Sequence, residues 1–232
     1  MAAGVVEALD ILGFAVVPSV IDDDRVAALR SQGLDLLTRR DGSLAEIFRA
    51  PCLASRPFLE IARHPMILSV TAQLIPGRVI LNQQNLVCNP GGRAKYSQSR
   101  FHRDFPYQHF TSSRPLGINV LVALDEFTLT NGATRVIPAS HKVEYFPSDG
   151  FVSEWATQVL APAGSFIFLN TMTYHAGGEN QSANDRLAVN NVYTSPLIRT
   201  QVDFRQEAAP GYWESLSEDE IAFLHWERTP DA

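Results

Sequence analysis

The sequence is poor in the features that mark several large classes of protein. Its 232 residues include two cysteines, Cys52 and Cys88, and no metal-binding spacing surrounds them. This argues against a thiolate metal cluster and favours a reducing compartment, with the cytoplasm as the expected location. The formal net charge is -6 and no basic block is present, so nucleic acid is not an expected partner.

Long apolar runs are also absent. No run approaches the roughly 18 residues that a membrane-spanning helix needs, so no membrane partner is expected. Residues 1–17 are largely apolar, but they include Glu7 and Asp10 and lack a basic start, which indicates folded sequence rather than a signal peptide. With 45% hydrophobic and 19% charged residues, the chain can build a sizeable core, and residues 1–232 are expected to form one domain.

The first third of the chain has the spacing of amphipathic helices around one short strand. Residues 13–18 are β-prone and end in proline, and residues 19–24 offer caps and acidic side chains for the first turn of a helix. Residues 57–75 predict two helices that are separated at Pro65. A last helix is expected to begin near Ser217, because residues 217–220 have the pattern of a capping box.

From residue 78 onward short β-prone segments dominate. They cover residues 79–87, 101–107, 116–124, 133–138, 164–169 and 187–193, with one short helix expected within 153–160. Helices followed by many short strands are typical of the α+β class. The predicted fold is a double-stranded β-helix, or jelly-roll (cupin-like) core, over about residues 78–195, with flanking N-terminal helices over 1–77 and a C-terminal tail over 196–232.

One short stretch carries the clearest chemical signal. His102 and Asp104 lie two residues apart between aromatic side chains. Because side chains alternate along a strand, both are expected on one face, with Arg103 on the other. His175 follows an apolar segment and offers a third ligand. Two imidazoles and one carboxylate form the facial triad of non-haem Fe(II) oxygenases, although Zn(II) and Mn(II) accept the same types of ligand.

Arg186 lies eleven positions after His175. A guanidinium holds a carboxylate through two parallel hydrogen bonds. Near a metal with open positions, Arg186 is therefore a candidate anchor for the far carboxylate of a chelating 2-oxo acid. The alternative is an ordinary surface ion pair, for example with Asp185.

Four consecutive amide side chains, residues 82–85, interrupt the β-prone segment 79–87. Whichever face of the strand is buried, two of them should point inward. Buried amides need hydrogen-bond partners, so these side chains are expected to line a polar pocket. The alternative is an edge strand with solvated amides.

Together these features resemble those of the phytanoyl-CoA dioxygenase (PhyH) family of Fe(II)/2-oxoglutarate-dependent oxygenases. The resemblance covers roughly residues 11–195, and the combination of motifs is more specific than any single one. The motifs are residues 13–18 with the acidic helix start that follows, 101–104, 131–142, 164–177, Asn180 and Arg186.

The resemblance implies that His102, Asp104 and His175 hold Fe(II) and that Arg186 anchors 2-oxoglutarate. The implied function is a dioxygenase that uses O2 and 2-oxoglutarate to hydroxylate a small-molecule substrate, with release of succinate and CO2. A desaturase or cyclase variant of this chemistry, a non-catalytic cupin-like binding protein and a Zn(II) hydrolase are the alternatives. The protein is expected to act as a monomer or homodimer.

The resemblance also implies contacts to 2-oxoglutarate from Gln83 or Gln84, and less directly from Asn82. One position departs from the family pattern. Family members often carry a hydroxyl residue two positions after the distal histidine, where this sequence has Gly177. A hydrogen bond to the co-substrate is therefore either missing or supplied elsewhere, for example by Thr134 or Tyr193.

The remaining histidines and the loops give weaker signals. His109 is either a substrate contact or a packed side chain, and His141 is expected to be structural because no second ligand lies nearby. His64 and His225 are expected on helices in structural roles. Loops within 93–115, 143–160 and 200–232 should shape access of the substrate. The nearby side chains that are either substrate contacts or solvated groups are Lys95, Arg100, Arg103, Tyr107 and Arg114.

Overall fold

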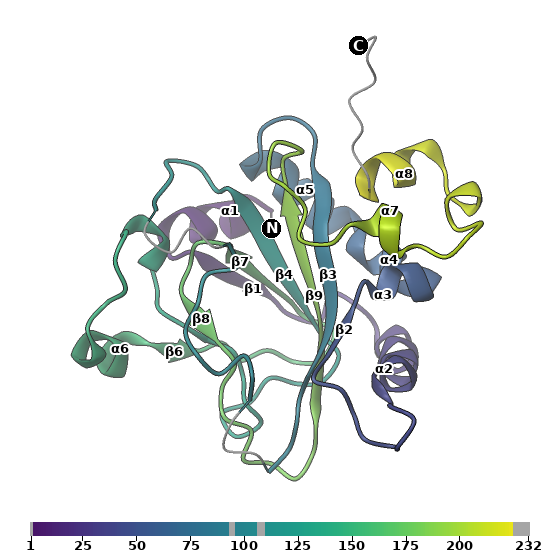
Figure 1. The fold of residues 1–232 in the computed structure, drawn as a ribbon. Helices are drawn as coiled ribbons and strands as arrows, with labels where there is room; N and C mark the ends of the chain where they lie inside the picture. Colours follow the sequence, from purple (N-terminus) through teal and green to yellow (C-terminus); the bar gives the residue numbers. More distant parts are fainter. Residues whose placement is uncertain (1, 93–95, 106–109, 225–232) are drawn as a thin grey trace.

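The computed structural model describes residues 2–92, 96–105 and 110–224 and contains two antiparallel sheets (Figure 1). The larger sheet has six strands in the order β1-β7-β4-β9-β3-β2, and every neighbouring pair is antiparallel. These strands are β1 (Phe14–Val17), β2 (Ile47–Arg49), β3 (Ile80–Asn89), β4 (Gly117–Ala123), β7 (Phe166–Asn170) and β9 (Arg186–Thr194).

The smaller sheet lies against one face of the larger one. Its three strands have the order β6-β5-β8 and span Thr157–Gln158, Arg135–Val136 and His175–Ala176 respectively. Side chains from β3, β4 and β9 of the larger sheet and from β8 of the smaller sheet line a common cavity. Two facing antiparallel sheets with helices on the outside confirm the predicted α+β, jelly-roll type of fold.

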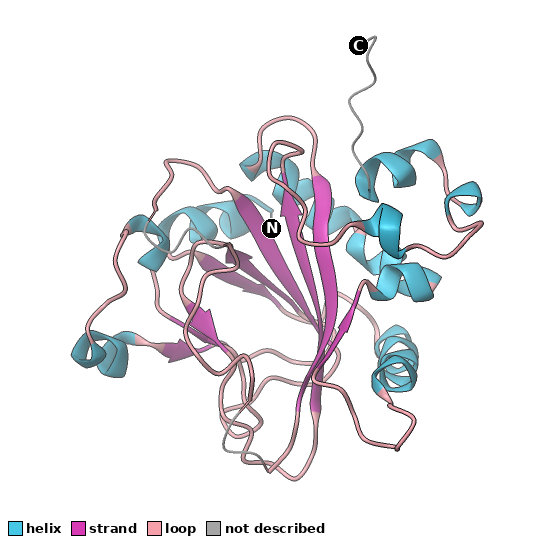
Figure 2. Ribbon diagram, viewed as in Figure 1, coloured by secondary structure: helices cyan, strands magenta, loops and turns pink. Residues whose placement is uncertain are grey.

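Helices cover the outer face of the larger sheet (Figure 2). One apolar cluster joins these helices to outward side chains of the strands, among them Val120, Phe168 and Tyr193. No helix in the described part of the chain has both the length and the apolar character needed to cross a bilayer. The helices are α1 (Ala2–Ile11), α2 (Asp23–Leu37), α3 (Pro51–Ala54), α4 (Arg56–Ala62), α5 (Pro65–Leu74), η1 (Ser140–Lys142), α6 (Asp149–Trp155), α7 (Phe204–Glu207), η2 (Trp213–Ser215) and α8 (Glu218–Leu224).

Strand β4 shows how the sequence pattern produces these layers. All seven of its residues are buried, because it lies in the middle of a sheet that is covered on both faces. Val120 and Val122 pack into the cluster beneath the helices, whereas Leu121 packs into a second cluster between the two sheets. Asn119 is the polar exception on this inner face, and it reaches the cavity.

Most predicted elements are confirmed, and two differ. The predicted helix within 153–160 is wrong in position: Ser148 caps a helix that already ends at Trp155, and the next residues pair with β5 as strand β6. Residues 101–105 form an isolated bridge rather than a regular strand. The capping box is confirmed, since Glu220 Oε2 accepts a hydrogen bond of 3.0 Å from the backbone N–H of Ser217.

Candidate metal centre

His102 and His175 are brought together by one antiparallel bridge, although they lie 73 positions apart in the sequence. Each backbone N–H donates to the other residue's carbonyl, at 2.9 and 3.0 Å. Residues that face each other in such a pair project their side chains to the same side. The two imidazole ring centres therefore lie 4.5 Å apart.

The carboxylate of Asp104 lies beside the two imidazoles and completes the cluster. Its Oδ1 lies 3.6 Å from Nε2 of His175, and one candidate ligand atom from each of the three residues falls within 4.8 Å of the others. Arg103, between the two predicted ligands, points away, with its guanidinium carbon 4.2 Å from the centre of the Tyr174 ring. The alternation predicted from the His-x-Asp spacing is thus present, even though this stretch is not a full strand.

Backbone carbonyls orient both imidazoles. Nδ1 of His102 lies 2.9 Å from the carbonyl oxygen of Arg100, and Nδ1 of His175 lies 3.0 Å from that of Thr173. A carbonyl only accepts, so each Nδ1 carries the proton and each Nε2 keeps a free lone pair. Hydrogen bonds of this kind fix the ring and the tautomer of histidines that bind metals.

Asn119 performs the same task for the carboxylate. Its Nδ2 donates to Oδ1 and Oδ2 of Asp104, at 3.2 and 3.1 Å. Burial, and after it the neighbouring His175, lowers the pKa of His102 and outweighs the opposing effects of the Arg100 carbonyl and Asp104. A lowered pKa keeps the imidazole neutral, which is the form that binds a metal.

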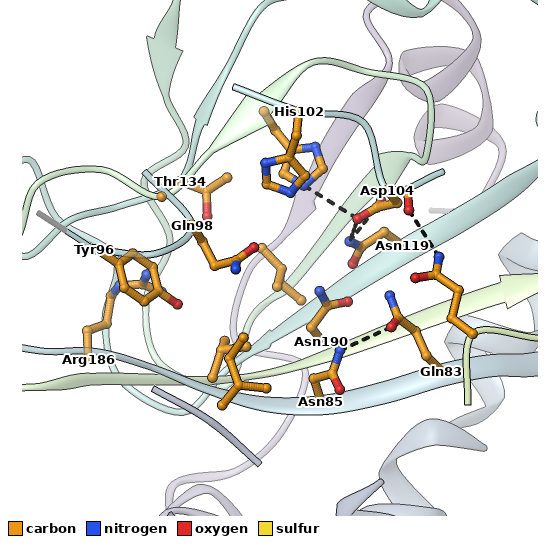
Figure 3. A pocket seen from close by; sticks show the side chains of 16 residues that line it. Gln83, Asn85, Tyr96, Gln98, His102, Asp104, Asn119, Thr134, Arg186 and Asn190 are labelled. Atoms are coloured by element: carbon orange, nitrogen blue, oxygen red, sulfur yellow. Dashed lines mark hydrogen bonds and ion pairs between the residues drawn. The ribbon is translucent and has the colours of Figure 1, made fainter. Parts of the chain in front are cut away.

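The three residues open into a cavity of about 250 Å³ between the two sheets (Figure 3). Its wall is mostly polar and neutral, and its charged or titratable members besides the triad are Tyr96 and Arg186. The described lining residues are Ile47, Gln83, Asn85, Val87, Tyr96, Gln98, His102, Asp104, Asn119, Leu121, Thr134, His175, Gly177, Arg186, Asn190 and Gln201.

Arg186 is buried at the start of β9 and has no acidic partner among the described residues. Its side chain is 4% exposed, its guanidinium carbon lies 3.9 Å from the centre of the Phe127 ring, and its Nε has no hydrogen-bond partner in the described part of the chain. Burial lowers its pKa to about 10, although Tyr96 and Asp125 favour the charged form. The predicted alternative, an ion pair with Asp185, is not formed; Asp185 instead accepts a hydrogen bond from the N–H of Gly91.

These residues fit the group that the resemblance implies. A buried cation without a counter-charge is costly and becomes favourable when an anion binds to it. The donor set of two imidazoles and one carboxylate suits Fe(II), and Arg186 in the same cavity suits a carboxylate. One molecule with a metal-chelating end and a distal carboxylate can satisfy both.

The four amides of β3 divide between the two faces of the larger sheet. Gln83 and Asn85 line the cavity. Gln84 faces the helices, where its amide contacts Cys52 N, Phe58 O and Asn191 Oδ1, each at 2.8 Å. Asn82 bonds to Thr194 at the end of β9 and to Arg199 and Gln201 in the chain that follows. The structure therefore does not bring Asn82 or Gln84 to the cavity, which corrects two of the expected contacts to 2-oxoglutarate.

Of the two candidates for the missing hydroxyl, Thr134 and Tyr193, one lies at the cavity and the other does not. Thr134 lines the cavity beside the triad. Tyr193 is directed at the helices, and its hydroxyl donates to the carbonyl of Ala62 at 2.8 Å, so it is not available to the cavity. Gly177 lies in the cavity wall, where the ring of Tyr96 fills the space that a side chain would occupy.

The other histidines lie outside the cavity or outside the described residues. Nε2 of His141 lies 3.1 Å from the carbonyl of Asp10, and Nδ1 of His64 accepts from Met66 N at the start of α5. His109 and His225, like Lys95 and Tyr107, are not among the described residues. Arg100, Arg103 and Arg114 do not line the cavity.

Five polar residues of the wall were missed from the sequence. Asn119 and Asn190 stand within apolar strands, so strand alternation could have placed each of them on the inward face. Tyr96, Gln98 and Gln201 belong to irregular segments, and only the expectation that loops 93–115 and 200–232 shape the site pointed toward them.

The model of the family described as phytanoyl-CoA dioxygenase (PhyH) matches residues 10–188, and the chain belongs to this family. An uncharacterized protein of Mycobacterium tuberculosis, Rv1501, is 30% identical over 213 residues, which are 85% of this chain and 77% of the relative. The iron/alpha-ketoglutarate-dependent dioxygenase ausU of Aspergillus calidoustus is 28% identical over 195 residues, 69% of this chain and 63% of the relative.

A solved structure supports the fold. The epimerase SnoN, in complex with Fe3+, alpha ketoglutarate and nogalamycin RO, is similar with a TM-score of 0.71. The likeness covers 90% of each chain at 20% sequence identity, so it concerns the architecture.

Proposed function

We propose that this protein is a non-haem Fe(II)- and 2-oxoglutarate-dependent dioxygenase that hydroxylates a small organic molecule, with release of succinate and CO2. The observation that carries the proposal is one cavity that holds two imidazoles, a carboxylate and a buried arginine with no acidic partner among the described residues. A Zn(II) hydrolase would use the three ligands but would leave Arg186 without a role. The iron- and alpha-ketoglutarate-dependent relatives support the oxygenase.

The chain's own residues prepare this chemistry. When bound, iron and 2-oxoglutarate supply the activation of O2. His102 and His175 would hold the metal through Nε2, because each Nδ1 is engaged with a carbonyl. Three protein ligands would leave room at the metal for the co-substrate. Arg186 would bind the distal carboxylate of 2-oxoglutarate and so orient its chelating end.

The wall of the cavity favours an uncharged, oxygen-rich substrate. Gln83, Asn85 and Asn190 present amides on the floor formed by β3 and β9 (Figure 3). The Oδ1 atoms of Asn85 and Asn190 are buried and have no hydrogen-bond partner among the described residues. Hydroxyl groups of a substrate can donate to these oxygens, whereas a charged substrate would find only the triad and Arg186.

Visible absorption spectroscopy tests the proposal. Fe(II) and then 2-oxoglutarate are added to metal-free protein without oxygen. A weak charge-transfer band that needs both additions is expected in the wild type, and its loss is expected in His175→Ala and Arg186→Ala. Arg114→Ala, which removes an exposed arginine outside the cavity, should keep the band and serves as the control.

The second measurement is release of succinate in air. Succinate without the band would contradict the assigned ligands, and a bound metal with neither signal would favour the Zn(II) hydrolase or a non-catalytic binding protein. Succinate release in the presence of trial substrates then identifies the substrate, and product analysis separates hydroxylation from desaturation or cyclisation.

We also propose that the enzyme works in the cytoplasm as a monomer or homodimer, without nucleic acid or membrane partners. Both cysteines are buried and unpaired, as expected in a reducing compartment. Fractionation of cells and light scattering of the purified protein test location and oligomeric state.

A further inference from the structure

Gly177 leaves space that one specific side chain fills. A Cβ atom added at Gly177 would lie 2.8 Å from both Cδ1 and Cε1 of the Tyr96 ring. Real Cβ contacts are essentially never that short, so any residue other than glycine at 177 would displace the ring. The backbone holds the two segments together as well, since the N–H of Gly177 donates to the carbonyl of Gln98 at 2.7 Å.

Tyr96 is arranged as a ligand-binding residue rather than as ordinary core. It is 7% exposed and lines the cavity together with Arg186. Its hydroxyl makes no hydrogen bond to the described residues and points into the cavity (Figure 3). A buried phenol normally finds a partner, so a free one in a polar cavity is explained by a ligand that supplies it.

We propose that Tyr96 donates its hydroxyl hydrogen to the distal carboxylate of 2-oxoglutarate, next to Arg186, and that Gly177 exists in this chain to admit the Tyr96 ring. This inference rests on the proposed function. It explains why the chain departs from the family at residue 177: the hydroxyl is not missing but comes from another segment. The phenol stays protonated, because burial raises its pKa above the ordinary value.

Binding of 2-oxoglutarate, measured by anaerobic calorimetry on the Mn(II)-loaded protein, tests the inference. Tyr96→Phe should weaken binding about 10-fold, the usual effect of losing one hydrogen bond to a charged group. Binding of 2-oxobutyrate, which lacks the distal carboxylate, should not change. Tyr193→Phe is the matched control: it removes a phenol hydroxyl on the other face of the sheet and should leave the affinity for 2-oxoglutarate unchanged.

Substitution of Gly177 separates ligand binding from a merely structural role. Gly177→Ser should weaken binding in the wild-type background, because it displaces the ring. In a Tyr96→Ala background the same change should strengthen binding, because a hydroxyl returns to the vacated space. A simple packing defect would give the same sign in both backgrounds and would overturn the inference.

The outcomes distinguish this inference from the proposed function. If the wild type does not bind 2-oxoglutarate, both fall. If the wild type binds and Arg186→Ala does not, while Tyr96→Phe binds as the wild type does, only the role of Tyr96 is overturned, and Thr134 remains as the hydroxyl donor in the cavity.

Discussion

Alternate amides of strand β3 face two different environments. On the helix side, the Gln84 amide is fully engaged, with its oxygen accepting from Cys52 N and its nitrogen donating to Phe58 O and Asn191 Oδ1. On the cavity side, Asn85 donates to Gln83 at 3.2 Å, and its own Oδ1 has no partner among the described residues. Gln84 is fully buried and Asn85 is half-buried, but Oδ1 of Asn85 is itself shielded from water, so burial of the two amide oxygens does not separate them.

The two faces of β3 differ in how completely their amide groups are hydrogen-bonded. Buried polar groups that have all their hydrogen-bond partners stabilise the fold. A buried donor or acceptor without a partner destabilises it, unless a ligand supplies that partner. The same contrast separates two buried charges. Glu220 is paired with Arg56 and Arg63, whereas Arg186 has no acidic partner among the described residues. We therefore expect changes on the cavity side to affect function and changes on the helix side to affect stability.

The largest effect is expected at the metal ligands. Asp104→Ala should lower succinate release by more than about 100-fold, because even residues that only orient a ligand typically contribute 10- to 100-fold. The free energy of unfolding should change little, since the loss also removes a buried charge. Activity assays and urea unfolding measure the two effects. Asp149→Ala, at an exposed carboxylate on α6, should change neither.

Arg186→Met gives the next largest effect and tests the contrast directly. Binding of 2-oxoglutarate should weaken by about 10- to 100-fold, the value of losing hydrogen bonds from a charged group. The ligand-free variant should unfold at the same temperature as the wild type or higher, because methionine has no charge to desolvate. Calorimetric binding and thermal unfolding are the measurements. A marked fall in stability would show that Arg186 is structural.

Two neighbouring glutamines offer a matched pair. Gln84→Leu should lower the free energy of unfolding by about 1–3 kcal/mol, since it removes the hydrogen-bond partner of the buried Cys52 N–H and of the buried Asn191 Oδ1. Gln83→Leu should change stability by less than about 0.5 kcal/mol. It should lower turnover of an oxygen-rich substrate roughly 2- to 10-fold. Urea unfolding and steady-state kinetics of both variants decide the matter, and equal effects from the pair would remove the distinction between the faces.

Features that depend on a few neighbouring residues could be predicted from the sequence, whereas features that depend on distant pairing could not. The direction of His102 and Asp104 depends on a two-residue spacing, and the break at Pro65 depends on one residue, so both were predictable. The orientation of the amides depends on an irregularity between Leu81 and Gln83, where the pairing of β3 with β9 shifts by one residue. Such a shift exchanges the faces of a strand and has no clear signal in the sequence.

The wall of the cavity is harder still. Tyr96, Asn119 and Asn190 come from three separate segments, and the local pattern gives at most the face of the strand on which each asparagine lies. Their meeting depends on the pairing of β3, β4 and β9, which no short motif encodes. The triad was accessible because its motifs have a known chemistry, whereas neutral amides and one tyrosine acquire their role only from the three-dimensional arrangement.

The smallest effect is expected at the satisfied charge. Burial raises the pKa of Glu220, but hydrogen bonds from Ser217 and Arg56 outweigh it and lower the pKa to about 2. A folded-state pKa below the ordinary value of 4.5 means that Glu220 stabilises the protein above about pH 4.5 and that this contribution is lost as the pH falls toward 2. Glu220→Gln should therefore lower the unfolding temperature by a few degrees at pH 7, since about 1 kcal/mol corresponds to roughly 2–4 °C in a chain of this size.

The difference in unfolding temperature between variant and wild type should shrink as the pH is lowered from 5 to 3. Because both proteins contain the same other carboxylates, taking this difference cancels the effect of their titration. Thermal unfolding of both proteins across this range measures it. A difference that is constant with pH would show that packing of α8 rather than the charge of Glu220 holds the C-terminal helix in place, and the contrast with Arg186 would then rest on the cavity alone.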